Sequence, residues 1–202
     1  MIRLLIDLLR HGETTLSHTL RGHTDDELTE QGWLQMQSTI QNNIDNGSSW
    51  DVIFTSPLCR CQLFAERLAV KIQRPLIVNS NIKEMNFGDW EGLATQHIYE
   101  NFPEQLANFW QFPTQYHAPN GESLAQFQQR VMIGFEEISI QMQTEDWKNA
   151  LVVTHGGVIK LLTCLAREQH LNDLLKMPAE LGNLYQIELL KSLDQLTFIE
   201  RV

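Results

Sequence analysis

Residues 2–12 read IRLLIDLLRHG, a short apolar run that ends in a glycine-containing turn. A run of this length bounded by a turn signal predicts a buried strand. A similar pattern returns at residues 150–157, ALVVTHGG, and a helical pattern over 158–167 follows it at once. Two buried strands that each end in histidine and glycine indicate that one edge of the sheet carries polar groups.

The rest of the chain alternates strand and helix patterns. Further strands are predicted at 51–55, 75–78, 184–190 and 196–202, and further helices at 30–44, 58–72, 94–110 and 124–142. Thr29 is the expected cap of the first of these helices, and Ser56 caps the second, with Pro57 at its first position. This alternation predicts an α/β protein, a three-layer α/β/α sandwich whose mostly parallel sheet is covered on both faces. We expect one domain over 1–202, in which 84–121 form an excursion above the sheet.

The composition is that of an ordinary globular protein. Of 202 residues, 43% are hydrophobic and 20% charged, which excludes disordered and low-complexity classes. The formal charge of -10, with no cluster of Lys and Arg, argues against a nucleic-acid partner. No stretch reaches about eighteen consecutive apolar residues, so no membrane partner is expected. Three cysteines without a disulfide framework fit a reducing compartment, and we expect a cytoplasmic protein. The oligomeric state stays open.

Chemically active side chains follow four of the predicted strands: Arg10 and His11, then Arg60, then Glu84, then His155. Taken singly, each has an ordinary structural explanation. In open α/β sheets, however, ligands bind beyond the carboxyl ends of the strands. Gly156, at the start of a helix, lets backbone amides turn toward an anion. The combination predicts a site for a phosphate or carboxylate group.

Four sequence blocks resemble, in order, the signature of the histidine phosphatase superfamily, which has the phosphoglycerate mutase-like fold. The blocks are residues 10–14 (RHGET), 56–62 (SPLCRCQ), 84–92 (EMNFGDWEG) and 153–157 (VTHGG). The resemblance implies that His11 is the nucleophile that becomes phosphorylated and that Glu84 is the proton donor. It further implies that Arg10, Arg60 and His155 hold the phosphoryl oxygens. No metal and no cofactor are implied.

Elementary chemistry agrees with these roles. A neutral imidazole is a good nucleophile near neutral pH, and a phosphohistidine divides one difficult displacement into two easier ones. Two guanidiniums and a second imidazole can offset the phosphoryl charge that magnesium offsets in other enzymes. The sequence has no Walker loop, and residues 57–61 (PLCRC) do not match the Pro-Cys-x-x-Cys motif of zinc deaminases.

The substrate is expected to be a small phosphorylated metabolite. Residues 84–91, the chain length and residues 120–123 (NGES) are most similar to the alpha-ribazole phosphatase branch, which removes the 5′-phosphate of alpha-ribazole phosphate during assembly of the cobalamin nucleotide loop. Phe87, Trp90 and Trp110 serve either as stacking faces for the aromatic base or as core residues.

Three residues are further candidates for substrate binding. Ser17 could donate to a phosphate, and Gly22 lies close by in sequence. Arg21 stands where the family usually has a small residue. It reaches either a second anionic group of the substrate or the solvent.

Other functions remain open. Fructose-2,6-bisphosphatase-like and broad-specificity phosphatases share the same four blocks. Cofactor-dependent phosphoglycerate mutases carry a longer chain and a Trp-Asn pair where this chain has Leu16 and Ser17. A non-catalytic anion-binding protein on the same scaffold is the remaining alternative, although all five key groups are present.

Overall fold

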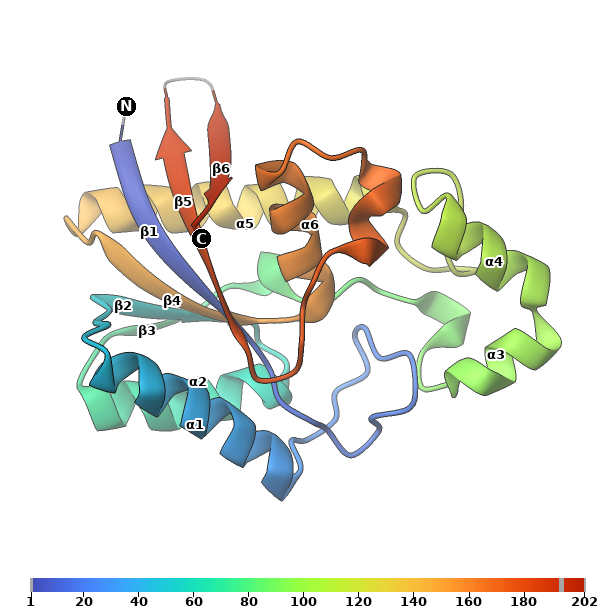
Figure 1. Cartoon of the computed structure of the whole chain (residues 1–202), viewed down its shortest axis with the longest axis horizontal. Helices are drawn as coiled ribbons and strands as arrows, with labels where there is room; N and C mark the ends of the chain where they lie inside the picture. Colours follow the sequence, from blue (N-terminus) through green and yellow to red (C-terminus); the bar gives the residue numbers. More distant parts are fainter. Residues whose placement is uncertain (1, 193–194, 202) are drawn as a thin grey trace.

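The computed structural model describes residues 2–192 and 195–201. Six strands form one sheet in the order β3-β2-β4-β1-β5-β6 (Figure 1). Four of them run parallel: β1 (Ile2–Arg10), β2 (Val52–Thr55), β3 (Leu76–Val78) and β4 (Asn149–Thr154). β5 (Leu184–Lys191) pairs antiparallel with β1, and β6 (Leu196–Glu200) pairs antiparallel with β5. The predicted mostly parallel sheet is confirmed. The last strand was predicted to reach residue 202, which lies outside the described residues.

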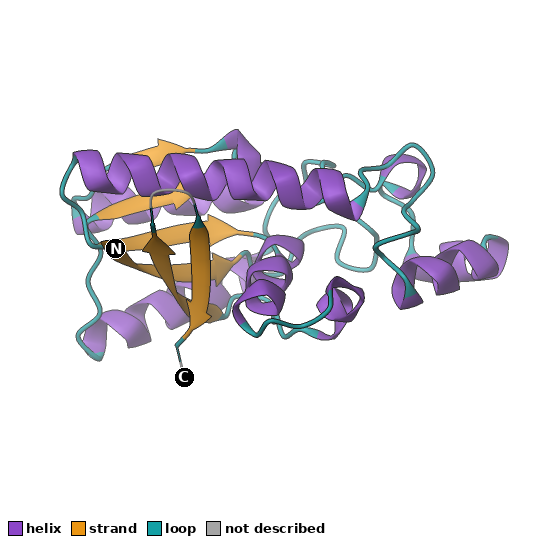
Figure 2. Ribbon diagram, turned by 90° about the horizontal axis from the view of Figure 1, so that it is seen from above, coloured by secondary structure: helices purple, strands orange, loops and turns teal. Residues whose placement is uncertain are grey.

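Helices cover both faces of the sheet. α1 (Glu30–Asp45) and α2 (Cys59–Ile72) lie on one face, and α5 (Leu124–Thr144) and α6 (Gly156–Ala166) lie on the other (Figures 1 and 2). The predicted three-layer sandwich is therefore confirmed. Among residues 2–192 and 195–201, no helix is both long enough and apolar enough to cross a bilayer.

Successive residues of the central strands pack into two different cores. In β4, Val152 packs with the α5 and α6 side, whereas its neighbours Leu151 and Val153 pack with the α1 and α2 side. β1 behaves in the same way, with Leu8 in the first core and Leu9 in the second. Because both faces are buried, these strands read as continuous apolar runs rather than as an alternating pattern.

Two helix predictions were wrong in detail. The helix expected over 94–110 is two helices, α3 (Thr95–Asn101) and α4 (Pro103–Gln111). Pro103 disfavours helical geometry at the preceding residue, and Phe102 accordingly has φ -136° and ψ 47°. α2 begins at Cys59 with Leu58 as its N-cap, so Pro57 is not a helical residue. The Thr29 cap of α1 is confirmed, because its side chain accepts a hydrogen bond from the amide of Gly32.

The excursion over 84–121 carries α3 and α4 to the end of the molecule remote from the tips of β5 and β6 (Figure 1). Its buried residues Ile98, Leu106 and Phe109 belong to the same apolar cluster as Leu8 of β1. Three short 3-10 helices complete the fold: η1 (Ser80–Ile82) just before the excursion, η2 (Gly88–Trp90) within it, and η3 (Leu171–Lys176) between α6 and β5. The excursion thus extends the main core and forms one wall of the candidate site.

Candidate active site

The parallel pairing of β1 and β4 brings the two predicted histidines together. Arg10 and Thr154 are register partners at the ends of the two strands, so the next residue of each is a neighbour of the other. The rings of His11 and His155 lie 5.3 Å apart between centroids, at 60° to each other. Both side chains are almost fully buried.

His11 is held in a single tautomer. Its Nδ1 lies 2.8 Å from the carbonyl oxygen of Gly12. A carbonyl oxygen accepts hydrogen bonds and cannot donate them, so Nδ1 carries the proton. The lone pair is therefore on Nε2, which is the nitrogen able to attack an electrophile.

His155 is oriented by Ser56. The Nε2 of His155 lies 2.7 Å from Ser56 Oγ, which comes from the loop after β2. The same hydroxyl accepts a longer hydrogen bond from the amide of Leu58 at 3.3 Å. Ser56 was predicted to be a helix cap, and its contact with a residue 99 positions away had no local signal in the sequence.

Both imidazoles are kept neutral by their surroundings. Burial lowers the pKa of His11 well below its usual range, and the charges of Arg60 and Arg10 lower it further. Burial and the charge of Arg60, followed by the neighbouring His11, lower the pKa of His155 in the same way. A neutral imidazole retains its lone pair, so the site keeps a nucleophile ready at neutral pH.

The two predicted arginines each have one buried nitrogen that is not used by the protein. The guanidinium of Arg10 donates through Nη1 to the carbonyl of Ala179. Arg60 is fully buried and donates to the carbonyls of Gly22 and Thr24 at 2.7 and 2.8 Å. Among the described residues, neither Nε atom has a hydrogen-bond partner. Buried polar atoms are normally satisfied, so each of these nitrogens has a hydrogen-bond donor left for an anionic ligand. Arg10 lines the cavity of the candidate site, whereas Arg60 is fully buried behind it.

Glu84 lies in the same site and occupies the N-terminus of α6. Its carboxylate accepts from the amide of Gly157 at 3.0 and 3.1 Å, and Oε1 also accepts from the amide of Met85 at 2.9 Å. A Cβ at residue 157 would lie 2.2 Å from Oε1, which explains the glycine. The helix end was predicted to face the anion, but this amide faces Glu84 instead. Arg130, which the sequence analysis did not identify, donates to the Glu84 carbonyl at 3.1 Å.

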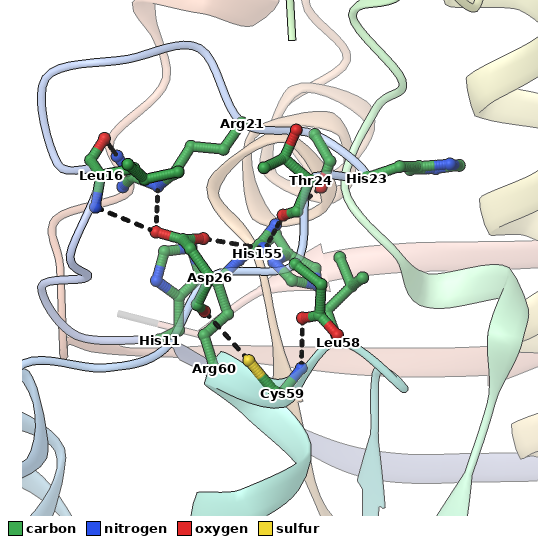
Figure 3. A network of polar contacts seen from close by, with 12 residues as sticks. His11, Leu16, Arg21, His23, Thr24, Asp26, Leu58, Cys59, Arg60 and His155 are labelled. Atoms are coloured by element: carbon green, nitrogen blue, oxygen red, sulfur yellow. Dashed lines mark hydrogen bonds and ion pairs between the residues drawn. The ribbon is translucent and has the colours of Figure 1, made fainter. Parts of the chain in front are cut away.

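Arg21 is neither exposed nor free. Its side chain is 8% exposed and lies 3.5 Å from Asp26, measured from Nε to Oδ2 (Figure 3). Asp26 also contacts Arg60 at 3.3 Å, from Oδ1 to Nη1. The solvent-facing alternative for Arg21 was wrong. Asp26 was missed because nothing local in the sequence shows that it bridges two cationic side chains.

The other candidates separate into two groups. Gly156 lines the cavity, and a Cβ there would lie 3.1 Å from the guanidinium carbon of Arg10. Gly22 does not line it; a Cβ at this position would lie 1.8 Å from the Met85 carbonyl, so the glycine permits a close approach of two loops. Ser17 sits in a turn and is not among the lining residues, whereas Arg21 is.

A cavity of about 260 Å³ opens onto this polar cluster. Its charged and polar lining includes Arg10, His11, Arg21, Glu84 and Lys160. Its apolar wall is formed by Leu20, Met85, Phe87, Phe109, Trp110, Pro113, Leu124, Phe127, Leu174 and Leu175. Arg60 and His155 lie behind the lining, in full burial.

Lys160 is a cation that the sequence analysis did not identify. It stands four residues after Gly156 on α6, and this spacing places both residues on one helix face. Its Nζ donates to the carbonyl of Leu175 at 2.7 Å. Burial lowers the pKa of Lys160, and the charge of Arg10 lowers it further.

The three aromatic candidates lie in different surroundings. Trp90 is 1% exposed and packs edge-on against Phe109, with ring centroids 6.0 Å apart. It is a core residue, and the stacking alternative was wrong for this position. Phe87 and Trp110 both line the cavity, and Trp110 is 49% exposed. Within the described residues, no group of three or more His, Cys, Asp or Glu side chains is placed to hold a metal ion.

Comparisons with known proteins agree with this geometry. A profile of the histidine phosphatase superfamily (branch 1) matches residues 6–199. The adenosylcobalamin/alpha-ribazole phosphatase of Escherichia coli (strain K12) is 34% identical over 180 residues, which cover 86% of this chain and 80% of that protein. A 2,3-bisphosphoglycerate-dependent phosphoglycerate mutase of Bartonella quintana (strain Toulouse) is 29% identical over 160 residues, 77% of each chain. The solved structure of Bacillus stearothermophilus YhfR has a TM-score of 0.83 at 27% identity and covers 98% of this chain and 96% of that one.

Proposed function

Because the chain belongs to the histidine phosphatase superfamily, we propose that it is a metal-independent phosphomonoesterase whose nucleophile is His11. One observation carries the proposal. The two neutral imidazoles lie 5.3 Å apart, and Arg10 and Glu84 line the cavity beside them. This set provides a nucleophile, an electrostatic clamp and a proton carrier within one pocket.

The first step transfers the phosphoryl group to the enzyme. His11 Nε2 forms a bond to phosphorus while the bond from phosphorus to the ester oxygen breaks. Glu84 gives a proton to that leaving oxygen. Its Oε1 accepts from the amides of Met85 and Gly157, whereas Oε2 accepts only from that of Gly157, so Oε2 is the better placed oxygen to exchange the proton. In the second step Glu84 takes a proton from water, which attacks the phosphohistidine and releases phosphate.

The phosphoryl charge is stabilised by donors that are already in place. The Nε atoms of Arg10 and Arg60, which have no hydrogen-bond partner in the part of the chain that the structure describes, donate to phosphoryl oxygens. His155, which Ser56 orients, supports the same group. Preorganised donors of this kind contribute roughly 10²–10³ each to the rate. No metal ion enters this scheme.

The apolar wall indicates what the leaving group is. A simple sugar phosphate or a phosphoglycerate has no apolar group that could cover Phe87, Trp110 and Leu174. An aromatic nucleoside fits the same wall, since its ring can stack on Phe87 or Trp110. We therefore propose alpha-ribazole 5′-phosphate as the substrate. The 34% identity to the Escherichia coli adenosylcobalamin/alpha-ribazole phosphatase supports this choice.

The test has two parts. Hydrolysis of p-nitrophenyl phosphate is measured with EDTA present for the native protein and for His11→Ala, and brief incubation with 32P-labelled substrate follows the phosphoenzyme. We expect activity and label in the native protein and neither in the variant. Equal rates for the two proteins, or a rate abolished by EDTA, would overturn the proposal. A native protein that binds phosphate but never becomes labelled would be a non-catalytic anion-binding protein.

The substrate is then ranked by kcat/KM in a panel of alpha-ribazole 5′-phosphate, fructose 2,6-bisphosphate, phosphoserine and 3-phosphoglycerate. We expect the aromatic ester to lead by at least about tenfold. A lead by fructose 2,6-bisphosphate, or equal values throughout, would refute this substrate.

A phosphoglycerate mutase is the second candidate, because the Bartonella quintana mutase is 29% identical to this chain. A mutase returns the phosphoryl group to a second phosphoglycerate and therefore shields the phosphoenzyme from water. Interconversion of 2- and 3-phosphoglycerate, followed by a coupled assay, separates the two activities. Transfer much faster than hydrolysis would favour the mutase.

A further inference from the structure

The carboxylate of Glu91 collects the backbone amides of one short loop segment, residues 22–24. It accepts from the amides of Gly22 at 3.0 Å, His23 at 2.9 Å and Thr24 at 2.9 Å. The hydroxyl of Thr24 donates to it as well, at 2.6 Å. A fifth donor, the amide of Phe87 at 2.9 Å, comes from the excursion that carries Glu91 itself.

The carbonyls of the same segment bind Arg60. Gly22 O accepts from Nη2 at 2.7 Å, and Thr24 O accepts from Nη1 at 2.8 Å. Residues 22–24 therefore lie between two charged side chains: their amides donate to the carboxylate of Glu91, and their carbonyls accept from the guanidinium of Arg60. Arg60 and Thr24 appear together in this network in Figure 3.

Two features link the orientation of Arg60 closely to the position of residues 22–24. A Cβ at Gly22 would lie 2.5 Å from Glu91 Oε1, so the loop is in direct contact with the carboxylate. Both terminal nitrogens of Arg60 are committed to the segment and to Asp26, and only Nε lacks a partner among the described residues. The direction in which Nε points is consequently set by where residues 22–24 lie.

We propose that Glu91 is a positioning residue for Arg60: by fixing residues 22–24, it aims the guanidinium at the phosphoryl site. The inference rests on the proposed function, since it requires Arg60 to act on a phosphoryl group. Glu91 itself does not line the cavity and touches no reacting atom.

The hydrogen bonds also keep Glu91 ionised. Burial opposes the charge, but the donors from Thr24, Phe87 and His23 outweigh it and lower the pKa of Glu91. A carboxylate can accept hydrogen bonds from all five donors, whereas an amide side chain would direct two N–H groups at N–H donors. Glu91→Gln is thus a small change in shape that removes the negative charge and replaces one of the two acceptor oxygens by a donor.

The experiment is a double-mutant cycle on p-nitrophenyl phosphate with Glu91→Gln, Arg60→Ala and both together. We expect Glu91→Gln to lower kcat by about 10- to 100-fold. Arg60→Ala should lower it by roughly 10²–10³-fold. If Glu91 acts through Arg60, adding Glu91→Gln to Arg60→Ala should change the rate less than about twofold.

Asp7→Asn is the matched control. Asp7 is also a buried carboxylate, and it accepts from Trp50 at 2.8 Å and Gln186 at 2.9 Å, neither of which lines the cavity. This variant should keep the native kcat whatever it does to stability. If Glu91→Gln does not fold, Thr24→Val removes only the hydroxyl donor and should show the same non-additivity at smaller size.

The outcomes separate the two proposals. An inactive native protein, or an Arg60→Ala variant as active as the native one, overturns the proposed function. A native protein that needs Arg60 but shows multiplicative effects of the two substitutions overturns only the role of Glu91. A Glu91→Gln rate equal to that of Asp7→Asn does the same.

Discussion

The two buried histidines should make the protein lose stability in mild acid. The side chains of His11 and His155 are 3% and 0% exposed, and burial together with the arginine charges lowers the pKa of both. In the unfolded chain their pKa is about 6.5. Below pH 6.5 both histidines are therefore protonated in the unfolded state but stay neutral in the folded state. As a result, the free energy of unfolding falls as the pH falls.

The size of the effect follows from linkage. For each histidine that stays neutral when folded, proton binding lowers the free energy of the unfolded state by RT ln(1 + 10^(6.5 − pH)). Between pH 7.5 and 5.5 this is a loss of about 1.4 kcal/mol per histidine, or about 2.8 kcal/mol for the pair. The loss continues until the pH reaches the lowered pKa values of the folded protein.

Urea unfolding at pH 7.5 and 5.5 measures this loss. The buffer must contain no phosphate, because a bound anion would favour the imidazolium form. His11→Asn and His155→Asn should each show a loss smaller than the native one by about 1.4 kcal/mol. His97→Asn, on an exposed position of α3, should show the full native loss. The reasoning is refuted if His11→Asn and the native protein lose equal stability between the two pH values.

Three further substitutions test other parts of the site. Gly22→Ala should lower the free energy of unfolding by at least about 2 kcal/mol in urea, because its Cβ would lie 1.8 Å from the Met85 carbonyl; an unchanged midpoint would contradict that contact. Lys160→Met should raise KM about tenfold for every phosphomonoester in steady-state assays, since it removes a cation from the cavity lining; an unchanged KM would show that Lys160 only holds the Leu175 carbonyl. Trp110→Ala should raise KM for alpha-ribazole 5′-phosphate by roughly 2- to 10-fold and leave KM for glycerol phosphate unchanged; equal effects on both would remove Trp110 as a stacking face.

The part of the site that the sequence predicted is the part built by strand ends. His11 and His155 each follow a buried strand directly, and register pairing of β1 with β4 is enough to make them neighbours. Strand patterns and turn signals can be recognised locally in the sequence. The rule that ligands bind beyond the carboxyl ends of the strands then assigns the site to these residues. Arg10 was found for the same reason.

The supporting network could not be predicted in this way. Glu91 contacts the loop at residues 22–24 across 67 to 69 positions, and Ser56 contacts His155 across 99. Such hydrogen bonds depend on how loops approach one another, and no periodic pattern encodes a loop's path. Lys160 is different, because its helical spacing from Gly156 was available in the sequence.

The way in which the arginines are held has a chemical consequence. A carboxylate that binds a guanidinium also neutralises much of its positive charge. A carbonyl orients the guanidinium but leaves its net charge unchanged. Arg10 is held by the carbonyl of Ala179 and Arg60 by those of Gly22 and Thr24, with Asp26 farther away at 3.3 Å. The charge of Arg10 is therefore largely available to a phosphoryl group, whereas Arg60 shares part of its charge with Asp26. The donors of both arginines are in place before the reaction and need no reorganisation during it. Inorganic phosphate meets the same donors, so the geometry that stabilises the transition state also favours retention of the product.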